Sequence, residues 1–429
     1  MITKRLHVLI IGSGGRESTL FWKIAQSPLV GSVLCAPGNG GIPASHRRDV
    51  SPMDFQGILR LCKTESIDLV VVGPEAPLCA GVVDYLAMHG IKAFGPRKTP
   101  AQLEASKVDT KILCYRLGIP TAEFDFSGAY KVSEKIIKRM GGELVIKADP
   151  LCDGKGVFVC STEEQALAAA ALCQTEKKFG KEGERIVIER RLRGRECSFM
   201  VLCDGTENCI MLPLSRDYKR AQESDRGENT GGTGAYSPLS DVDSKMQNRI
   251  MVEIIKPILR FYAEIGHPYQ GVLYAGIMIT EDGPMLLEIN VRFGDPETQV
   301  VLPRIESDIV PYLLACTERG GLAKLPALSI SQFPAVCTVA MAEGYPGPYS
   351  TGALITGMPN DPVAGERRLL FHAGTEQQGN ELVTSGGRVL CSVGLGWTVP
   401  MAKERSLETL RGIQFDGMTY RRDIAQNVQ

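Results

Sequence analysis

The sequence has 429 residues, of which 44% are hydrophobic and 23% are charged, a composition typical of a folded globular protein rather than a disordered or fibrous one. A chain of this length is too long for one hydrophobic core, so we expect roughly two to four domains. The 48 basic and 49 acidic residues nearly cancel, which excludes a strong electrostatic attraction to nucleic acid or anionic lipid and favours a small molecule or another protein as partner.

Cysteine usage and the N-terminus both indicate a cytoplasmic protein. The 13 cysteines include no CxxC pair and no Cys/His group at zinc-ligand spacing, so we expect reduced thiols. The first residues, MITKRLHVLIIGSGGRE, place basic residues before an apolar run, but that run is too short for a signal peptide and leads into glycine and charge. No stretch approaches the roughly 18 apolar residues of a membrane-spanning helix, so we expect no membrane association.

The region up to about residue 100 alternates short apolar runs with helical patterns. The runs LHVLIIG, SVLCAPGN, DLVVVGPE and KAFGP are separated by predicted helices from about residue 17, at 55–64 and at 81–89. Apolar strands separated by amphipathic helices predict a doubly wound parallel sheet. Ligands of such sheets bind at the carboxyl ends of the strands, where this chain has GSGGRE, APGNGG, VGPEAP and FGP.

The first glycine-rich turn fits an anion better than a dinucleotide. Gly12 and Gly14 match the first two glycines of a GxGxxG fingerprint, but Glu17 takes the third place. The second predicted strand ends in Ala36 and Pro37 rather than in the acidic residue that would bind a ribose, so a nicotinamide cofactor is disfavoured. A turn whose amides face a sugar phosphate and a merely structural turn both remain open.

From about residue 100 the pattern changes. AQLEASKVDTKILCYRLG predicts one long helix ending at Gly118, and residues 130–190 form a compact unit of helices and strands. Two antiparallel hairpins are predicted, SFMVLCDG with CIMLPLS and VLYAGIMIT with PMLLEINV, with a helix at 245–265 between them. We interpret RDYKRAQESDRGENTGGTGAYSP, residues 216–238, as a long functional loop. The last hundred or so residues predict a small α+β domain with a final helix at 400–410.

Two segments suggest nucleotide chemistry. In VIKADPLCDGKGV, residues 145–157, Lys147 projects from a strand beside a glycine-containing loop with Lys155, which can hold phosphates without a Walker motif; an ordinary hairpin tip is the alternative. Downstream, in IVIERRLRGRECSF, Glu189 ends a strand, Leu192 can face a base and Glu196 can reach a ribose.

The segment LLEINVRFGDPETQ, residues 286–299, alternates apolar and polar side chains as a strand does. Leu287, Ile289 and Val291 are predicted to face a core. Glu288, Asn290 and Arg292 would then share the other face, where two oxygen ligands and a guanidinium suit a magnesium-bound nucleotide. An edge strand with one solvated face is the alternative.

The motifs together resemble a known enzyme family. GSGGRE, APGNGG, VGPEAPL, FGP, the Ser106-Lys107 pair, VIKAD with GKGV, SRDYKR, NTGGTGAYSP, EINVRFGDPETQ, FHAGT and SGGRVL occur in the order found in glycinamide ribonucleotide synthetases, which are phosphoribosylamine-glycine ligases. These are ATP-grasp enzymes of de novo purine synthesis. The resemblance covers nearly the whole chain, from Val8 to about Asp423.

The resemblance implies an α/β and α+β multidomain fold. Residues 1–104 would form the N-terminal doubly wound domain that binds substrate, and residues 105–325 the central ATP-grasp region, with a mobile lid at about 123–192. Residues 326–429 would form the small C-terminal α+β domain. The implied reaction joins glycine to 5-phosphoribosylamine, with ATP as co-substrate and Mg²⁺, or alternatively Mn²⁺, as metal. The expected enzyme is a monomer with weak contacts to neighbouring purine-pathway enzymes.

The family's functional residues carry over to matching positions of this chain. For the nucleotide, the resemblance implies phosphate binding by Lys107 and Lys147 with Lys155 in a flexible cover, an adenine hinge from Glu189 to Leu192, and ribose binding by Glu196. It implies metal binding by Glu288 and Asn290 and catalytic roles for Arg292, Asp217 and Lys219. The implied substrate-binding residues are Gly14, Gly15, Asn39, Glu75, Gly231 and Asp295.

Several positions depart from the family pattern. Ser18 stands where the family commonly has His, Tyr218 replaces another His, Thr233 a Met and Val291 a Cys. The phosphate loop is ADPLCDGKG rather than a small-residue sequence such as ADGLAAGKG, so Pro150 stiffens it and Asp153 adds negative charge. None of these changes falls on the two metal ligands or on the strand lysine, so we expect activity with altered kinetics.

Three other functions stay open. Another ATP-grasp ligase, such as a carboxylase or a formate-using enzyme, would share the nucleotide residues, but SRDYKR and NTGGTGAYSP favour the glycine ligase. An oxidoreductase is disfavoured by Glu17 and by the missing acidic residue. A degenerate regulator that binds ATP without turnover would follow if Ser18, Pro150 and Asp153 abolish catalysis.

Overall fold

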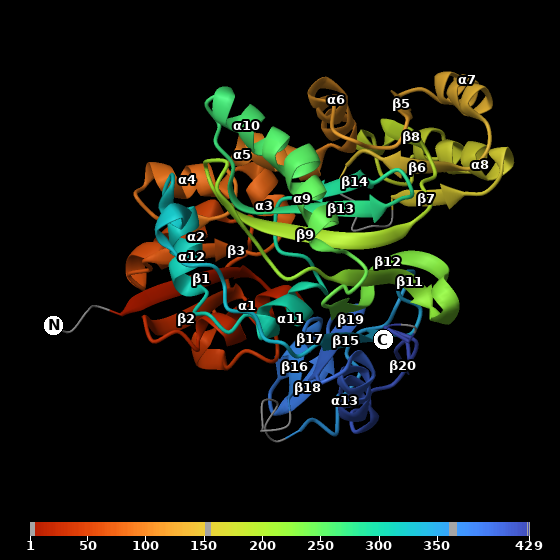
Figure 1. The fold of residues 1–429 in the computed structure, drawn as a ribbon. Coiled ribbons are helices and arrows are strands. Elements are labelled where there is room, and N and C mark those ends of the chain that lie inside the picture. Colours follow the sequence, from red (N-terminus) through yellow and green to blue (C-terminus); the bar gives the residue numbers. More distant parts are fainter. Residues whose placement is uncertain (1–4, 151–155, 360–366, 427, 429) are drawn as a thin grey trace.

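The computed structural model describes residues 5–150, 156–359, 367–426 and 428 (Figure 1). The N-terminal region forms a parallel sheet in the order β2-β1-β3-β4, as the sequence predicted. Its strands are β1 (Leu6–Gly12), β2 (Val30–Pro37), β3 (Leu69–Val72) and β4 (Ala93–Phe94), and its helices are α1 (Gly15–Ile24), α2 (Phe55–Thr64), α3 (Glu75–Ala80) and α4 (Val82–Met88). Residues 8–11 of β1 are fully buried because helices cover both faces of the sheet.

The predicted long helix before Gly118 is two helices, so that prediction was wrong. The chain forms α5 (Lys98–Ala105) and α6 (Lys107–Leu117), and Ser106 between them is extended, with φ −131° and ψ 114°. The Ser106 hydroxyl accepts a hydrogen bond from the Asp109 amide at 3.1 Å, which starts a new helix. The sequence predicted one helix because a single capping serine leaves the spacing of the apolar residues nearly unchanged across the break.

The lid is an antiparallel sheet in the order β5-β8-β6-β7, covered by two helices (Figure 1, upper right). It comprises β5 (Phe124–Ser127), α7 (Tyr130–Met140), β6 (Leu144–Ala148), β7 (Val157–Cys160), α8 (Glu163–Gln174) and β8 (Ile186–Arg190). Its buried core is built from its own residues, among them Ile137, Ile146 and Ile188. A separate core allows the lid to move as a unit.

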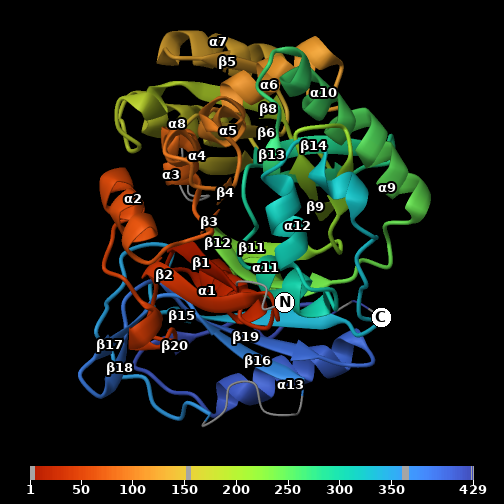
Figure 2. The same ribbon diagram turned by 90° about the vertical axis from the view of Figure 1, so that its left-hand side faces the viewer.

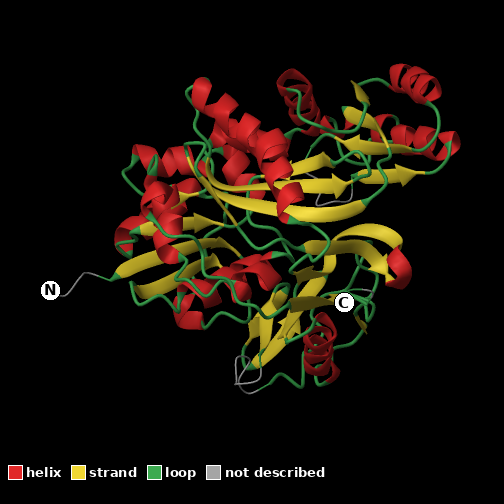
Figure 3. Cartoon of the chain, viewed as in Figure 1, coloured by secondary structure: helices red, strands yellow, loops and turns green. Residues whose placement is uncertain are grey.

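The central sheet, in the order β10-β9-β13-β14, contains the two predicted antiparallel hairpins. Its strands are β9 (Arg195–Asp204), β10 (Cys209–Met211), β13 (Gln270–Ile279) and β14 (Pro284–Asn290). The predicted helix at 245–265 is confirmed as α9 (Ser244–Ile250), a π-helical turn (Met251–Ile255) and α10 (Lys256–Glu264). Its buried residues pack on one face of the central sheet (Figure 3).

One residue of β14 breaks the predicted alternation. The pairing of β14 with β13 shifts at a bulge, since Glu288 lies opposite Gly276 and Leu286 opposite Ile277. Leu286 is therefore buried, while Leu287, predicted to face the core, is only half-buried. Ile289 and Val291 are buried as predicted.

The predicted long loop at residues 216–238 is a β-hairpin, so that prediction was wrong. It forms β11 (Arg216–Gln222) and β12 (Arg226–Ser237), and β12 pairs with β15 (Ala335–Ala342) of the C-terminal region. Because β11 is only partly buried along its length, it carries polar residues and lacks the apolar pattern by which a strand is recognised in a sequence.

The C-terminal region adds the rest of this sheet, which has the order β11-β12-β15-β19-β16 with β20 beside β15. The further strands of this sheet are β16 (Arg368–His372), β19 (Arg388–Leu395) and β20 (Met418–Thr419), while β17 (Thr375–Gln378) and β18 (Glu381–Thr384) pair with each other in a separate sheet. The predicted final helix is α13 (Val399–Arg411). The short helices α11 (Thr298–Val301) and α12 (Val310–Cys316) connect the regions. Figure 2 shows the N-terminal sheet beside the C-terminal region and below the lid, and α1 contacts β16. Within the described ranges, every helix falls short of what a membrane crossing requires.

Candidate active site

Two cavities meet at the centre of the molecule. The first, of about 930 Å³, lies between the lid and the central sheet and is lined by residues of β6, β7, β9, β11 and β14. The second, of about 790 Å³, lies between the turns after β1 and β2 and the C-terminal region. Asp295, Tyr345 and Arg388 line both cavities, so the cavities share a wall. Molecules bound in the two cavities would therefore meet near Asp295.

The structure brings most of the predicted site residues together. The first cavity is lined by Glu75, Lys107, Lys147, Glu189, Leu192, Glu196, Asp217, Lys219, Gly231, Glu288, Asn290, Arg292 and Asp295, and the second by Gly14, Asn39 and Asp295. Gly15 is not among the described residues that line either cavity. A Cβ atom at Gly15 would lie 2.5 Å from the Gln299 Nε2, so the glycine allows α1 to pack closely against Gln299. Lys155 and Asp153 lie outside the described residues.

A buried carboxylate between two lysines forms one wall of the first cavity. The Glu189 Oε1 lies 2.6 Å from the Lys147 Nζ, and the Oε2 lies 2.5 Å from the Lys111 Nζ. Burial would raise the pKa of Glu189, but the two ammonium groups lower it below its usual value. Its carboxylate is thus occupied by the two lysines, and its backbone lies between Phe124 of β5 and Val145 of β6 in the lid sheet. The sequence interpretation missed Lys111, although it lies four residues after Lys107 on one face of α6.

The start of the phosphate loop is tied to the beginning of α6. Asp149 accepts hydrogen bonds from the Ser106 hydroxyl at 3.0 Å and from the Val108 amide at 2.8 Å. The Lys107 Nζ donates to the Pro150 carbonyl oxygen at 2.9 Å. Acidic groups stabilise a helix N-terminus, so Asp149 fixes the end of β6 against α6. This contact sets where the loop that follows Pro150 begins.

The polar face of β14 forms an acidic wall opposite β11. The Lys219 Nζ lies 3.3 Å from the Glu288 Oε1 and 3.3 Å from the Glu196 Oε2. Lys219, with Lys147 and Lys107 beyond it, outweighs burial and lowers the pKa of Glu288 to about 2. Burial raises the pKa of Asp217 to about 8, and Glu297, Glu196 and Glu288 add to the effect against the opposing charge of Lys219.

This wall fits a divalent cation that is shared with a nucleotide. Glu288 and Asn290 present hard oxygen atoms from one strand, and the ammonium of Lys219 shows that the Glu288 carboxylate accommodates a cation. Among the described residues, no group of three or more His, Cys, Asp or Glu side chains is placed to hold a metal by itself. Mg²⁺ is commonly held by one or two carboxylates with phosphate oxygens and water, and this donor set matches that pattern.

Arg292 links the acidic wall to the N-terminal region. Its Nε donates to the Glu75 Oε2 at 3.0 Å, its Nη2 lies 3.0 Å from the Glu104 Oε1, and the same Nη2 donates to the Asn290 Oδ1 at 3.3 Å. Burial would raise the pKa of Glu75, but Arg292 and Arg16 lower it to about 2. Burial raises the pKa of Glu104 to about 7 despite Arg292. Glu104 carried no sequence signal, because it lies inside an ordinary helical pattern, and Arg16 belongs to the GSGGRE motif but had been assigned no role.

Two side chains of the C-terminal region organise the junction of the cavities. The Arg388 Nη1 donates to the Gly231 carbonyl oxygen at 2.6 Å and to the Asp295 carbonyl oxygen at 2.7 Å, and it lies 3.4 Å from the Asp295 Oδ1. The Tyr345 hydroxyl accepts the Gly231 amide at 3.0 Å. Burial would raise the pKa of Asp295, but Arg388 and Arg16 lower it. Arg388 belongs to the SGGRVL motif and Tyr345 to the GYPGPY turn, yet neither had been assigned a role.

Four of the unusual residues make contacts within the protein, and one of them, Tyr218, also lines the first cavity. The Ser18 hydroxyl accepts the His372 amide at 3.3 Å, so the smaller side chain at position 18 contacts β16. The Tyr218 hydroxyl accepts the Ala425 amide at 3.0 Å near the C-terminus. The Thr233 hydroxyl donates to the Tyr218 carbonyl oxygen at 2.8 Å, and Val291 is fully buried.

Comparison with known proteins agrees with this architecture. Family models described as the N, ATP-grasp (A) and C domains of phosphoribosylglycinamide synthetase match residues 6–104, 105–298 and 335–427. Relatives called phosphoribosylamine-glycine ligase from Vibrio vulnificus and Rhizobium meliloti are 43% and 44% identical to the chain. These alignments cover 98% of this chain in both cases and 97% and 98% of the relatives.

Solved structures show the same fold. A phosphoribosylamine-glycine ligase from Thermotoga maritima superposes with a TM-score of 0.83 at 34% identity, covering 98% of this chain and 100% of the other. A biotin carboxylase from Campylobacter jejuni shares the fold with a TM-score of 0.70 at 16% identity, covering 97% of this chain and 93% of the other. With three domain matches in order and relatives of this identity over nearly the whole length, the chain belongs to the phosphoribosylglycinamide synthetase family.

Proposed function

We propose that the chain ligates glycine to 5-phosphoribosylamine with ATP, giving glycinamide ribonucleotide, ADP and phosphate in de novo purine synthesis. The observation that carries this proposal is the shared wall of the two cavities at Asp295, Tyr345 and Arg388. The first cavity has the lysines and oxygen ligands that suit ATP, and the second is lined by the glycine-rich turns of the N-terminal domain. An acyl phosphate formed in one cavity would lie within reach of an amine bound in the other.

The proposed reaction depends on electrostatic stabilisation and on exclusion of water more than on covalent catalysis by the protein. The glycine carboxylate attacks the γ-phosphoryl group of ATP to give glycyl phosphate and ADP, and the amine of phosphoribosylamine then displaces phosphate. Lys147, Lys219 and Arg292 line the cavity where negative charge develops, and preorganised cations of this kind stabilise transferring phosphoryl groups. Closure of the lid over the cavity would exclude the water that hydrolyses an acyl phosphate.

Glu288 and Asn290 are the proposed metal ligands, and Mg²⁺ held there would neutralise phosphate charge. Mn²⁺ prefers the same oxygen ligands, so we propose that it can replace Mg²⁺. In this proposal residues 1–104 bind substrate, residues 105–325 form the ATP-grasp region with a mobile lid at about 123–192, and residues 326–429 form the C-terminal domain. We further propose a cytoplasmic monomer that has weak contacts with neighbouring enzymes of its pathway.

The test is product formation by the purified protein. ADP and phosphate release is measured with Mg-ATP, glycine and phosphoribosylamine generated from ribose 5-phosphate and ammonia, omitting one component at a time, and the product mass is determined. Turnover that requires every component supports the ligase. Release without glycine but with bicarbonate or formate would favour another ATP-grasp ligase, and ATP binding without turnover would favour the degenerate regulator. Saturable NAD(P) binding would favour the alternative hypothesis that the protein is an oxidoreductase.

A further inference from the structure

The wall of the second cavity contains an arginine for which the proposed mechanism gives no role. Arg47 follows a short 3₁₀ helix (Ala44–His46) and forms a bridge with Cys35 near the end of β2. Its side-chain stem lies against Gly38, because a Cβ atom at that glycine would be 3.1 Å from the Arg47 Cγ. Gly38 has a φ of +74°, so both its conformation and this contact favour glycine. The pair places the Arg47 side chain in the lining of the second cavity.

The guanidinium of Arg47 lacks a protein partner. Its Nε is buried without a hydrogen-bond acceptor, and among the described residues no carboxylate forms an ion pair with it. The neighbouring Arg48, by contrast, donates to the Glu65 Oε1 at 2.7 Å. The side chain as a whole is half-buried, so the guanidinium can donate to an anion that binds in the cavity it lines.

Three amides of the glycine-rich turns already have acceptors within the protein. The Gly14 amide donates to the Glu17 Oε2 at 2.6 Å, the Gly40 amide to the Thr375 carbonyl oxygen at 2.8 Å, and the Gly41 amide to the Asn39 Oδ1 at 3.0 Å. The sequence left open whether the first turn binds a sugar phosphate through its amides or is merely structural. Because these three amides are used within the protein, a guanidinium in the lining is the stronger candidate to bind a phosphate.

The other charged residues of the cavity leave Arg47 as the available cation. Arg388 is held by the Asp295 carboxylate and by two carbonyl oxygens. The two further carboxylates of the lining, Asp49 and Glu376, belong to exposed residues, so water solvates them. A dianionic group inside the cavity would therefore meet one guanidinium whose charge is uncompensated by the described residues.

We propose that Arg47 binds the phosphate group of the amine substrate and makes the enzyme selective for a phosphorylated sugar amine. The planar guanidinium can donate two parallel hydrogen bonds to phosphate oxygens. With the phosphate at Arg47, the amine end of the sugar lies toward the shared wall at Asp295. This inference rests on the proposed function, since it identifies the second cavity as the site of the amine substrate.

Binding measurements test the site without any turnover. Titration calorimetry with ribose 5-phosphate and with ribose compares the wild-type protein with the variants Arg47→Gln, Arg47→Lys and Arg48→Gln. Loss of a charged hydrogen-bonding pair weakens binding by roughly ten- to a hundredfold, so we expect this loss for ribose 5-phosphate in Arg47→Gln. Arg47→Lys keeps the charge and should lose less. Arg48→Gln removes the same charge one residue away, outside the lining, and should bind ribose 5-phosphate as the wild type does.

Kinetics then test selectivity. In Arg47→Gln, the KM for phosphoribosylamine should rise by a similar factor, while the rate with unphosphorylated ribosylamine and the KM values for ATP and glycine stay unchanged. These unchanged values also show that the variant is folded. Equal ribose 5-phosphate affinity in Arg47→Gln and wild type would overturn the inference, even in an active ligase. Arg47-dependent binding in a protein without ligase turnover would keep the phosphate site and overturn the proposed function instead.

Discussion

Buried charges at the first cavity are held in place by other buried charges. Lys147 donates to the Leu287 carbonyl oxygen at 2.9 Å and shares Glu189 with Lys111, so this proposed phosphate-binding lysine is oriented by the bulge in β14 and by α6. The Lys111 Nζ also contacts the Thr121 Oγ1 at 2.5 Å. Lys111 therefore acts as a positioning residue for Lys147.

Replacing Lys111 should destabilise the protein and weaken nucleotide binding. In Lys111→Met the Glu189 carboxylate loses one of its two cations, and breaking a buried ion pair typically costs about 3–5 kcal/mol of unfolding free energy. The Lys147 ammonium would also turn fully toward Glu189 and away from phosphate. Urea unfolding and the ATP KM measure the two effects. The double variant Lys111→Met/Glu189→Gln should regain part of the stability, and a double variant no more stable than Lys111→Met would contradict the charge explanation.

His372 should make stability depend on pH. Burial lowers the pKa of His372 to about 4 from a usual value of 6.5, so the unfolded chain binds its proton first as the pH falls. The folded state then loses on the order of 3 kcal/mol relative to the unfolded state between pH 6.5 and 4. Urea unfolding of wild type and His372→Asn across this range isolates the contribution. The stability advantage of the wild type should shrink toward pH 4, and a constant difference would show that His372 does not titrate as argued.

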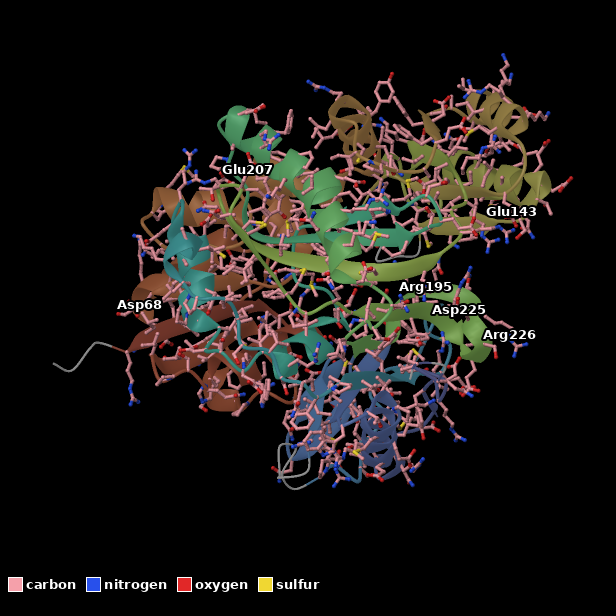
Figure 4. All side chains as sticks on the ribbon, in the orientation of Figure 1. Asp68, Glu143, Arg195, Glu207, Asp225 and Arg226 are labelled. Carbon is pink, nitrogen blue, oxygen red and sulfur yellow. The ribbon has the colours of Figure 1, made fainter. Side chains whose placement is uncertain are left out.

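At the scale of elements, the β11–β12 hairpin carries Asp217, Lys219 and Gly231, and the C-terminus fixes its position. The Arg421 side chain is 2% exposed, and its Nη1 donates to the Arg220 carbonyl oxygen at 3.0 Å. The Asp423 carboxylate binds Arg421 and accepts the Ser224 amide at 2.8 Å. Asp225 and Arg226 mark the tip of this hairpin in Figure 4. The residues after β20 thus hold a strand that lines the first cavity.

Removing this anchor should impair turnover more than nucleotide binding. In Arg421→Ala the hairpin loses a charged contact at Arg220, so Asp217 and Lys219 are less well ordered. We expect the turnover number to fall about tenfold, equivalent to about 1.4 kcal/mol, with a smaller change in the ATP KM. Hydrogen exchange of residues 216–237 should increase. Arg422→Ala is the control, because the Arg422 contact with Glu223 uses the backbone amide. Equal exchange in Arg421→Ala and wild type would refute the anchoring role.

Elements with a strong apolar period were predictable, and polar elements were not. The strands β1, β3, β9 and β13 follow from apolar runs, and α2 and α13 from helical spacing. The β11–β12 hairpin was not predicted because it is stabilised by pairing with β15, a strand about a hundred residues away. The same limit applies to the site. Motifs located Lys147, Glu288 and Arg292, whereas Lys111, Glu104 and Arg47 are recognisable only from neighbours that distant segments supply.

For the whole molecule, two hydrogen bonds join the proposed lid to the sheets that line the first cavity. Besides the Lys147 contact with β14, the Asn229 Nδ2 of β12 donates to the Val157 carbonyl oxygen of β7 at 3.1 Å. This bond joins the lid to the sheet that continues into the C-terminal region. Because the lid has its own core, such contacts between the units decide how closed it is.

Breaking the Asn229 bond should favour an open lid. A neutral hydrogen bond contributes about 1 kcal/mol, so in Asn229→Ala we expect the ATP KM to rise about fivefold, because nucleotide binding must then close the lid without this contact. Hydrogen exchange of residues 157–160 should increase in the nucleotide-free protein and return toward the wild-type level when ATP is bound. Glu228→Gln changes the exposed neighbour of Asn229 and serves as the control. If exchange in β7 were the same in Asn229→Ala and wild type, the bond would not hold the lid. Lid closure would then depend on Lys147 and on the nucleotide itself.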